Sequence, residues 1–432
     1  MPLNFKPTSY RLKSMSSGIE FHDSGWLLET PGEDQPALVR AVYDTIQPDF
    51  SKHENGFFRF ADWLPLRRVF DGSSAPVTYK SERLAAHLGL QNLFVTFSGW
   101  WPEKGVFMPT CSFKETEAYS VCGRMTPDMQ KKVLVVASAG NTARAFAKVC
   151  SANQIPLLLC VPKDNLDALW FSNALNPCVK LVCTSKGSDY FDAIHLSNII
   201  SGFEGFYAEG GAKNVARRDG MGTTMLSATT FIGSIPDYYF QAIGSGTGAI
   251  AAWEANLRLI ADGRYGTHKM KLMVSQNAPF QPIYEAWKAK SRAMLPYDDA
   301  EARQHVEEID AKVLSNRKPP YPIIGGLFDA LTDAGGDVLL VDNEAARSAA
   351  ALFETLEGID IHPAAAVAVA SLVQAVNDNC IPADATVMLN ITGGGEARYK
   401  AEHQLTYLTP DIILPPDASA AEIRQKIGQL KW

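Results

Sequence analysis

Short apolar runs alternate with helix-length segments from residue 77 onward, and this alternation restricts the fold more than any other feature of the chain. Strands buried on both faces are continuously apolar, and intervening helices place such strands parallel in βαβ units. The pattern therefore predicts an α/β protein with two parallel-sheet domains that meet at a cleft, where ligands of such folds usually bind. The runs form a first series and a second one: 92–97, 132–138, 155–162 and 179–185, then 237–243, 269–275 and 385–392.

The glycine-rich loop in AIGSGTGAIAAWEA is the sharpest local signal, because a strand ends at Ile243 and a helix is expected directly after the loop. Glycines let backbone N–H groups turn toward a ligand, and the helix N-terminus adds partial positive charge. The loop lacks the Lys-Ser/Thr pair of a P-loop. We predict a phosphate cradle here, with a plain strand-to-helix turn as the alternative. The cradle residues are Gly244, Ser245, Gly246, Thr247 and Gly248.

A second polar loop, in ASAGNTARAFA, also joins a strand to a helix. Ser138, Asn141 or Thr142 could each serve as a helix cap. A loop with three polar residues around Ala139 and Gly140 can also offer N–H groups and hydroxyls to a carboxylate, and it leaves the Asn141 amide for another ligand atom. Both interpretations stay open on this loop alone.

Lys114 and Thr392 add an amine and a hydroxyl to the phosphate cradle and the Asn141 amide. Lys114 follows a Pro-Thr-Cys-Ser-Phe turn and starts a helical segment, although a lysine there opposes the helix dipole by up to about 1 kcal/mol. Thr392 stands where the last strand ends, before three glycines. A cradle, an amine, an amide and a strand-end hydroxyl are what pyridoxal phosphate requires. We expect His362 to be structural and predict no metal site, because that histidine has no partner at metal-ligand spacing.

The composition limits the partners of the chain. The formal net charge of −7 and the sequence pI near 5.7 argue against bulk electrostatic binding to nucleic acid or to an anionic membrane. The seven cysteines include no CxxC pair, which favours a reduced compartment over a disulfide scaffold. The N-terminus lacks the apolar core of a signal peptide, and no run approaches the ~20 apolar residues of a membrane span. We expect a soluble cytoplasmic protein.

The sequence resembles the fold type II pyridoxal-phosphate enzymes, which include threonine synthase and cysteine synthase, and within them it is most similar to the cysteate synthases. The resemblance covers about residues 59–400 and implies the tryptophan-synthase-β-like architecture, a homodimer, and the cofactor in the interdomain cleft. Its motifs include RFADWLP, SFKETEA, VLVVASAGNTARAFA, GSGTG, GGLFDALTDAGGDV, EGIDIHPAAAVAVASL and LNITGGG.

The resemblance also implies an organisation and roles. Residues 1–60 would form an N-terminal extension, 61–114 with 226–432 the large cofactor-binding domain, and 115–225 a small mobile α/β domain. Lys114 would form the Schiff base and shuttle the Cα proton, and Asn141 would bond the ring hydroxyl. The 244–248 loop would hold the cofactor phosphate, and Thr392 would face the pyridine nitrogen. The candidate substrate-binding residues are Ser138, Ala139, Gly140, Thr142, Lys104 and Arg144, and two further cations, Lys213 and Arg217, are expected near the cleft.

The implied reaction is a β-replacement that converts O-phospho-L-serine and sulfite to L-cysteate and phosphate through an aminoacrylate intermediate. Three alternatives stay open: a threonine synthase acting on phosphohomoserine, a cysteine-synthase-like enzyme with another nucleophile, and a silent relative with a regulatory role. The chain departs from the family pattern in two places. Ser14 and Ser17 stand where relatives often carry a CxxC-like pair, so a metal knuckle is not expected. Cys111 replaces a common glycine and is expected to alter the substrate side of the pocket.

Overall fold

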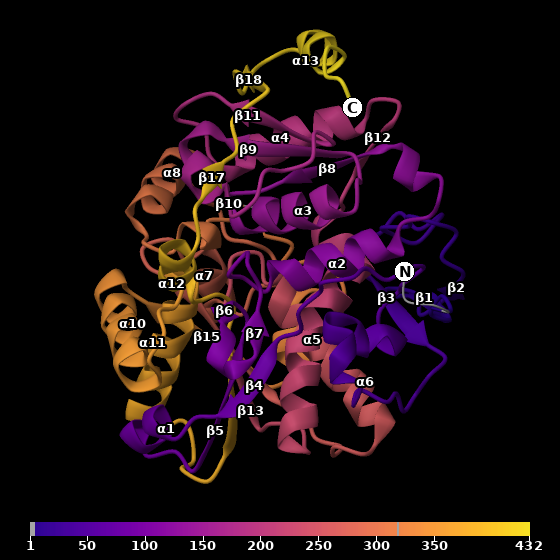
Figure 1. Cartoon of the computed structure of the whole chain (residues 1–432). Coiled ribbons are helices and arrows are strands. Elements are labelled where there is room, and N and C mark those ends of the chain that lie inside the picture. Colours follow the sequence, from indigo (N-terminus) through magenta and orange to yellow (C-terminus); the bar gives the residue numbers. More distant parts are fainter. Residues whose placement is uncertain (1–4, 318) are drawn as a thin grey trace.

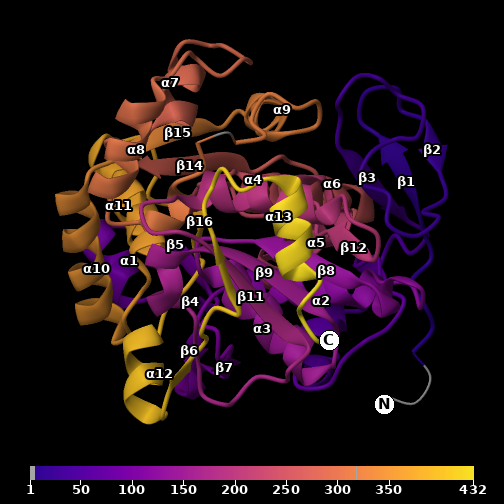
Figure 2. The same ribbon diagram turned by 90° about the horizontal axis from the view of Figure 1, so that it is seen from above.

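The computed structural model describes residues 5–317 and 319–432. Figure 1 shows two α/β units, one above the other, and Figure 2 shows a small sheet formed by the first strands at one side of them. The expectation of two units built on mainly parallel sheets is confirmed. Within the described ranges, no helix has both the length and the apolar character needed to cross a membrane.

The larger sheet has six strands in the order β15-β14-β13-β16-β5-β4. The neighbouring strands run parallel except β4, which is antiparallel to β5 at one edge. The apolar runs predicted at 92–97, 237–243, 269–275 and 385–392 form four of these strands. The six are β4 (Val77–Lys80), β5 (Asn92–Phe97), β13 (Tyr238–Ala242), β14 (Lys271–Asn277), β15 (Asp337–Val341) and β16 (Thr386–Ile391).

Helices cover both faces of this sheet, so its side chains alternate between two cores. Val387 and Leu389 of β16 pack with α10 and α11, whereas Met388 packs in the core that holds α5 and α6. Burial on both faces explains why the strand sequence is continuously apolar. The helices of this unit are α1 (Arg83–Leu88), α5 (Val215–Ile232), α6 (Thr247–Asp262), α7 (Pro282–Lys288), α8 (Asp299–Glu308), α9 (Leu327–Asp333), α10 (Asn343–Glu357), α11 (Pro363–Asn377) and α12 (Glu396–Glu402).

The smaller sheet is entirely parallel, in the order β12-β8-β9-β11-β18. Three of its strands are the predicted runs 132–138, 155–162 and 179–185. Helix α2 packs against both α3 of this unit and α5 of the larger one, so it joins the two. The elements are β8 (Val133–Ala137), β9 (Leu157–Pro162), β11 (Val179–Thr184), β12 (Phe206–Ala208), β18 (Ile412–Leu414), α2 (Lys114–Arg124), α3 (Asn141–Ala152), α4 (Tyr190–Ser201) and α13 (Ala420–Ile427).

The C-terminal segment corrects the predicted domain boundary, which placed all of 226–432 in the large domain. Strand β17 (Thr406–Tyr407) pairs with β10 (Trp170–Phe171), and β18 then extends the smaller sheet beside β11. Helix α13 packs in the same core as α4, and Figure 2 shows it over the smaller unit. The short apolar run of β18 supplies hydrogen-bond partners to a strand that would otherwise be an open edge.

The N-terminal extension forms an antiparallel sheet although its sequence shows no clear periodicity. Its strands are β1 (Tyr10–Ser14), β2 (Glu20–Phe21) and β3 (Val39–Tyr43). Around the expected knuckle position, the hydroxyls of Ser14, Ser16 and Ser17 donate to the Glu33 carboxylate. In the part of the chain that the structure describes, no group of three or more His, Cys, Asp and Glu side chains could hold a metal ion.

Candidate active site

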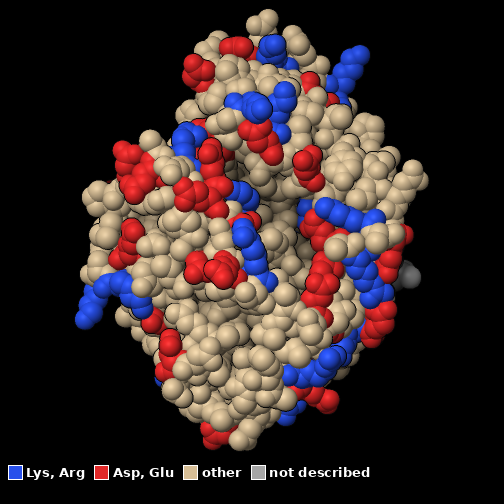
Figure 3. Space-filling model, turned by 90° about the vertical axis from the view of Figure 1, so that its left-hand side faces the viewer, with Lys and Arg blue, Asp and Glu red and all other residues tan. Residues whose placement is uncertain are grey.

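A cavity lies between the two units, where strand ends from both sheets meet helix N-termini. The face shown in Figure 3 is hollowed between the units, with Lys, Arg, Asp and Glu side chains around the hollow. The cavity brings together twelve of the fourteen predicted site residues, from four separate stretches of the chain. These are Lys114, Ser138, Ala139, Gly140, Asn141, Thr142, Gly244, Ser245, Gly246, Thr247, Gly248 and Thr392.

The glycine loop at 244–248 forms an open cradle at the start of α6. Gly246 has φ +79°, and a Cβ added there would lie 2.6 Å from Leu327 Cδ2. A Cβ on Gly248 would lie 2.6 Å from the Gln241 side chain, so both positions require glycine as the loop stands. The Ser245 and Thr247 hydroxyl oxygens lie 2.8 Å apart. Backbone N–H groups, two hydroxyls and a helix N-terminus together fit a phosphate group.

Lys114 begins α2 at the end of a backbone segment that is tied to the last strand of the larger sheet. Phe113 N–H donates to the Thr392 carbonyl at 2.9 Å, and Ser112 forms a bridge with Gly393. The Lys114 side chain is 20% exposed, and its Nζ lies 3.2 Å from Glu117 Oε2. Burial lowers the pKa of the amine below its usual value, although Glu117 acts in the opposite direction. A deprotonated amine is a nucleophile, so this placement suits covalent chemistry.

The second loop is held in shape by Ser138, whose Oγ accepts hydrogen bonds from the N–H groups of Gly140 and Ala143, each at 2.9 Å. Asn141 Oδ1 accepts a hydrogen bond from Arg144 at 3.0 Å. Because that bond fixes the amide oxygen, the amide nitrogen of Asn141 is the group left for a ligand. The start of α3 adds partial positive charge to this wall of the cavity.

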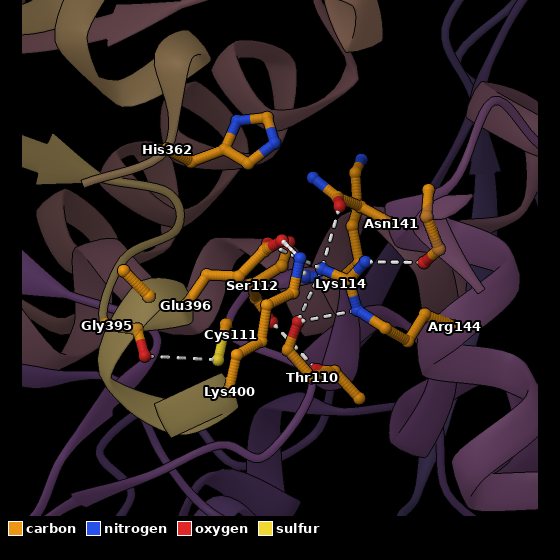
Figure 4. A network of polar contacts seen from close by, with 12 residues as sticks. Thr110, Cys111, Ser112, Lys114, Asn141, Arg144, His362, Gly395, Glu396 and Lys400 are labelled. Atoms are coloured by element: carbon orange, nitrogen blue, oxygen red, sulfur yellow. Dashed lines mark hydrogen bonds and ion pairs between the residues drawn. The ribbon is translucent and has the colours of Figure 1, made fainter. Parts of the chain in front are cut away.

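Arg144 and Lys104, predicted to bind substrate, lie outside the cavity. The buried Arg144 guanidinium donates to the carbonyls of Thr110 and Ala168 and stacks 4.1 Å from the Trp170 ring, as Figure 4 shows in part. Its N–H donors are occupied by these carbonyls and by Asn141, so Arg144 positions Asn141 and is not available to bind substrate. The Lys104 amine lies 4.6 Å from the centre of the Tyr79 ring, where a cation–π contact holds it.

Of the two further cations considered, one reaches the cavity. Arg217 of α5 lines it and is 8% exposed, whereas Lys213 pairs with Glu29 at 2.8 Å near the surface. The difference arises because Arg217 lies on the helix face turned to α2. Sequence patterns place a residue on a helix but do not say which neighbouring element that helix meets.

His362 corrects the expectation of a purely structural residue, because it lines the cavity as well as capping α11. Ala364 N–H donates to His362 Nδ1 at 3.2 Å, so the neutral ring carries its proton on Nε2. Burial lowers the pKa of His362 to about 4, which keeps the ring neutral near pH 7. Figure 4 shows the ring extending toward the same region as Asn141. The sequence signal for this position was the His-Pro pair before an alanine-rich helix.

Other cavity residues that the sequence did not single out come from elements whose contacts only the fold defines. They are Ser112, Phe113, Tyr190, Met221, Gln241, Ala242, Ile243, Val313, Leu314, Asn316 and Ala364.

Cys111 lies away from the cavity, contrary to the expectation that it alters the substrate side. Its φ of +52° is in the left-handed region, where glycine is favoured. The thiol is 3.7 Å from the Gly395 carbonyl and packs with Trp170 and Tyr399. The glycine that relatives carry here is therefore explained by backbone conformation.

A lysine amine, a phosphate cradle, an amide and a strand-end hydroxyl in one cavity fit pyridoxal phosphate, and the close neighbours of Gly246 and Gly248 leave no room for a Cβ at either position of the cradle. Residues 101–393 match the family described as "Pyridoxal-phosphate dependent enzyme". The protein is thus a pyridoxal-phosphate-dependent enzyme.

Similar proteins of known name identify one family within the pyridoxal-phosphate-dependent enzymes. A cysteate synthase of Methanosarcina barkeri is 44% identical over 418 residues, 96% of this chain and 99% of the relative. That of Methanospirillum hungatei is 44% identical over 98% of each chain, and that of Methanocella paludicola 48% identical over 86% of this chain and 87% of the relative. The chain belongs to the cysteate synthase family.

Solved structures show the same fold at low identity. Maize serine racemase has a TM-score of 0.54 at 15% identity, covering 76% of this chain and 92% of that one. Threonine deaminase isoform 2 from Solanum lycopersicum has a TM-score of 0.51 at 16% identity, covering 76% and 86%.

Proposed function

We propose that the chain replaces the phosphate of O-phospho-L-serine with sulfite, yielding L-cysteate and inorganic phosphate. The family name supports the product, and the chemistry of the cavity supports anionic substrates. The Cβ–O bond breaks and its electron pair leaves with phosphate, while the lone pair of the sulfite sulfur forms the new Cβ–S bond. The replacement therefore needs no oxidant or reductant.

The observation that carries the proposal is the convergence of four helix N-termini on one cavity. Helices α2, α3, α6 and α11 begin at Lys114, Asn141, Thr247 and Pro363, and each has a residue of its first turn in the cavity wall. The cations of the cavity, Lys114 and Arg217, are largely neutralised by the buried Glu117 carboxylate, so the N-terminal ends of the helices supply much of the positive potential. Such a cavity suits a phosphorylated amino acid and a small inorganic anion.

The cofactor would be held by residues that the fold has already positioned. When bound, pyridoxal phosphate supplies an aldehyde that condenses with amines and a ring that withdraws electrons from the substrate Cα. The 244–248 loop would bind its phosphate, and the Asn141 amide nitrogen would donate to the ring hydroxyl. Thr392 would place a hydroxyl at the ring nitrogen. A hydroxyl does not protonate that nitrogen as a carboxylate would, which favours elimination over transamination.

The substrate would be handled by two sets of groups. Its carboxylate would accept hydrogen bonds from the N–H groups of the 138–142 loop and the Thr142 hydroxyl. Lys114 Nζ would take the Cα proton before phosphate leaves and return it after sulfite adds, so one amine serves as base and then as acid. Burial of the amine, which lowers its pKa, brings it closer to the range where both roles are possible.

The test is product analysis with the purified, cofactor-loaded protein. We expect cysteate and phosphate in equal amounts from phosphoserine and sulfite, and neither from Lys114→Ala. Threonine from phosphohomoserine, or cysteine from phosphoserine and sulfide at the higher rate, would replace the proposed reaction with one of the two alternative enzymes. Normal cofactor binding without turnover of any of these substrates would favour a regulatory relative.

We further propose a cytoplasmic homodimer in which the smaller unit moves relative to the larger one on substrate binding. Several cysteines lie buried and unpaired in the described cores, as suits a reducing compartment. With the correction above, and because α5 lies in the larger unit, the mobile unit would comprise 115–214 together with the segment from about 404 to the C-terminus. Light scattering coupled to size exclusion measures the oligomer, and a mass of one chain would reject the dimer.

A further inference from the structure

A chain of four charges, three of them buried, begins at Lys114 in the cavity wall. Lys114 Nζ lies 3.2 Å from Glu117 Oε2, and Glu117 Oε1 lies 2.8 Å from Arg217 Nη2. Arg217 Nη1 lies 2.5 Å from Glu209 Oε2. The charges alternate in sign along this chain, and its cavity end is the amine that the proposed function makes reactive.

The Glu117 carboxylate is fully buried, with an exposed fraction of 0%. It follows Lys114 by three residues on α2, so the helix turns both side chains to one side. Taking a carboxylate out of water costs several kcal/mol, and a paired apolar replacement is often at least as stable. Fold stability therefore gives little reason for a carboxylate at this position, whereas contact with a reacting amine gives a chemical one.

We infer that Glu117 is a positioning residue that holds the Lys114 amine and sets its affinity for a proton, with Arg217 limiting the effect. This inference rests on the proposed function, in which Lys114 accepts and returns the substrate Cα proton. Glu117 stabilises the ammonium form of Lys114, which favours proton abstraction. Arg217 shares the charge of Glu117, so the ammonium is not held too firmly to give the proton back.

The electrostatic surroundings of Lys114 support this division of roles. Burial lowers the pKa of Lys114, Glu117 and Glu209 raise it, and Arg217 lowers it. The neighbouring Glu115 points to the other side of α2, where it pairs with Lys148 and accepts a hydrogen bond from Thr110 at 2.8 Å. Glu115 is therefore a matched control: a buried carboxylate on the same helix, paired with a different lysine.

The test is the proton affinity of Lys114 itself, measured on the full-length chain freed of cofactor. Competitive labelling with an amine-reactive reagent, read by mass spectrometry at a series of pH values, gives the midpoint for that lysine. In Glu117→Gln we expect the midpoint to fall by about one to three pH units, the usual effect of losing an opposite charge at this distance. In Glu115→Gln it should stay at the wild-type value. An unchanged midpoint in Glu117→Gln, or equal shifts in both variants, would overturn the inference.

Two further measurements keep the outcome decisive. Should Glu117→Gln fail to fold, Glu117→Asp keeps the charge on a shorter side chain. Its labelling midpoint should fall by less than one unit, and the limb of the kcat–pH profile that reports the free amine should move to lower pH by a similar amount. A wild-type midpoint and a wild-type pH profile would overturn the inference. A different result would refute the proposed function without refuting this inference. Wild-type enzyme that makes no cysteate, while the Glu117→Gln shift is present, refutes the reaction and leaves the coupling of Glu117 to Lys114 intact.

Discussion

The phosphate cradle can be tested by comparing two glycines at opposite ends of one helix. Gly246 precedes α6 with φ +79°, and Gly263 follows it with φ +78°. Replacing either by alanine imposes a left-handed conformation on a residue with a Cβ, at a cost of about 1–2 kcal/mol. A Cβ at Gly263 has no neighbour within 4 Å, whereas at Gly246 it would lie 2.6 Å from Leu327 Cδ2.

Both variants should therefore lose similar stability as cofactor-free proteins, with Gly246→Ala somewhat worse because the Leu327 side chain must move. Stabilisation by the bound cofactor should differ between the two variants. At a hundred times its Kd, a ligand stabilises the folded state by about 2.7 kcal/mol. If the displaced loop binds the cofactor phosphate ten times more weakly, about 1.4 kcal/mol of that stabilisation is lost in Gly246→Ala and none in Gly263→Ala.

The assay is urea unfolding of wild type and both variants, with and without pyridoxal phosphate at one fixed concentration. The decisive quantity is the cofactor-induced increase in the free energy of unfolding, which cancels the backbone strain common to the two substitutions. Equal increases in Gly246→Ala and Gly263→Ala would refute the assignment of 244–248 as the phosphate site.

Three other predictions concern residues whose placement the structure decides. Arg144→Met should lower kcat about tenfold, because Asn141 loses its 3.0 Å hydrogen bond from Arg144 and a tenfold loss is roughly the effect of one hydrogen bond. Lys104→Met should leave steady-state turnover unchanged, because the Lys104 amine lies on the Tyr79 ring outside the cavity. The pKa of His362 is about 4 when folded and 6.5 ordinarily, so its contribution to stability is full above about pH 6.5 and is lost as the pH falls toward about 4. Urea unfolding across that range should show a weaker decline in His362→Asn, and an identical decline would contradict the burial of this ring. A chelator should change neither turnover nor the unfolding midpoint, because hydroxyls surround Glu33 at the expected knuckle position; loss of activity on chelation, restored by a metal, would reveal a metal requirement.

The cavity shows which parts of a site can be predicted from local pattern. Asn141 and the 244–248 loop each follow the carboxyl end of a parallel strand, the first in the smaller sheet and the second in the larger one. Such ends are where α/β folds bind ligands, so each loop was predictable as part of a site. That the two sheet edges face one cavity, together with Lys114, depends on how the two units pack. The placement of Lys104 was not predictable, because the nearest ring to its amine is that of Tyr79 on β4, far back in the chain, although Trp101 nearby also contributes. Glu117 and Arg217 meet only because α2 packs on α5.

The sequence by itself determined the class of fold and the cofactor, because periodic burial and glycine-rich turns are local properties that neighbouring residues specify. Tertiary structure decided the rest. In the folded chain the C-terminal segment pairs with the smaller sheet, Arg144 binds the Asn141 side chain outside the cavity, and His362 lines the cavity. Each of these depends on contacts between residues far apart in the chain, whose formation follows from how whole elements pack rather than from the residues on either side.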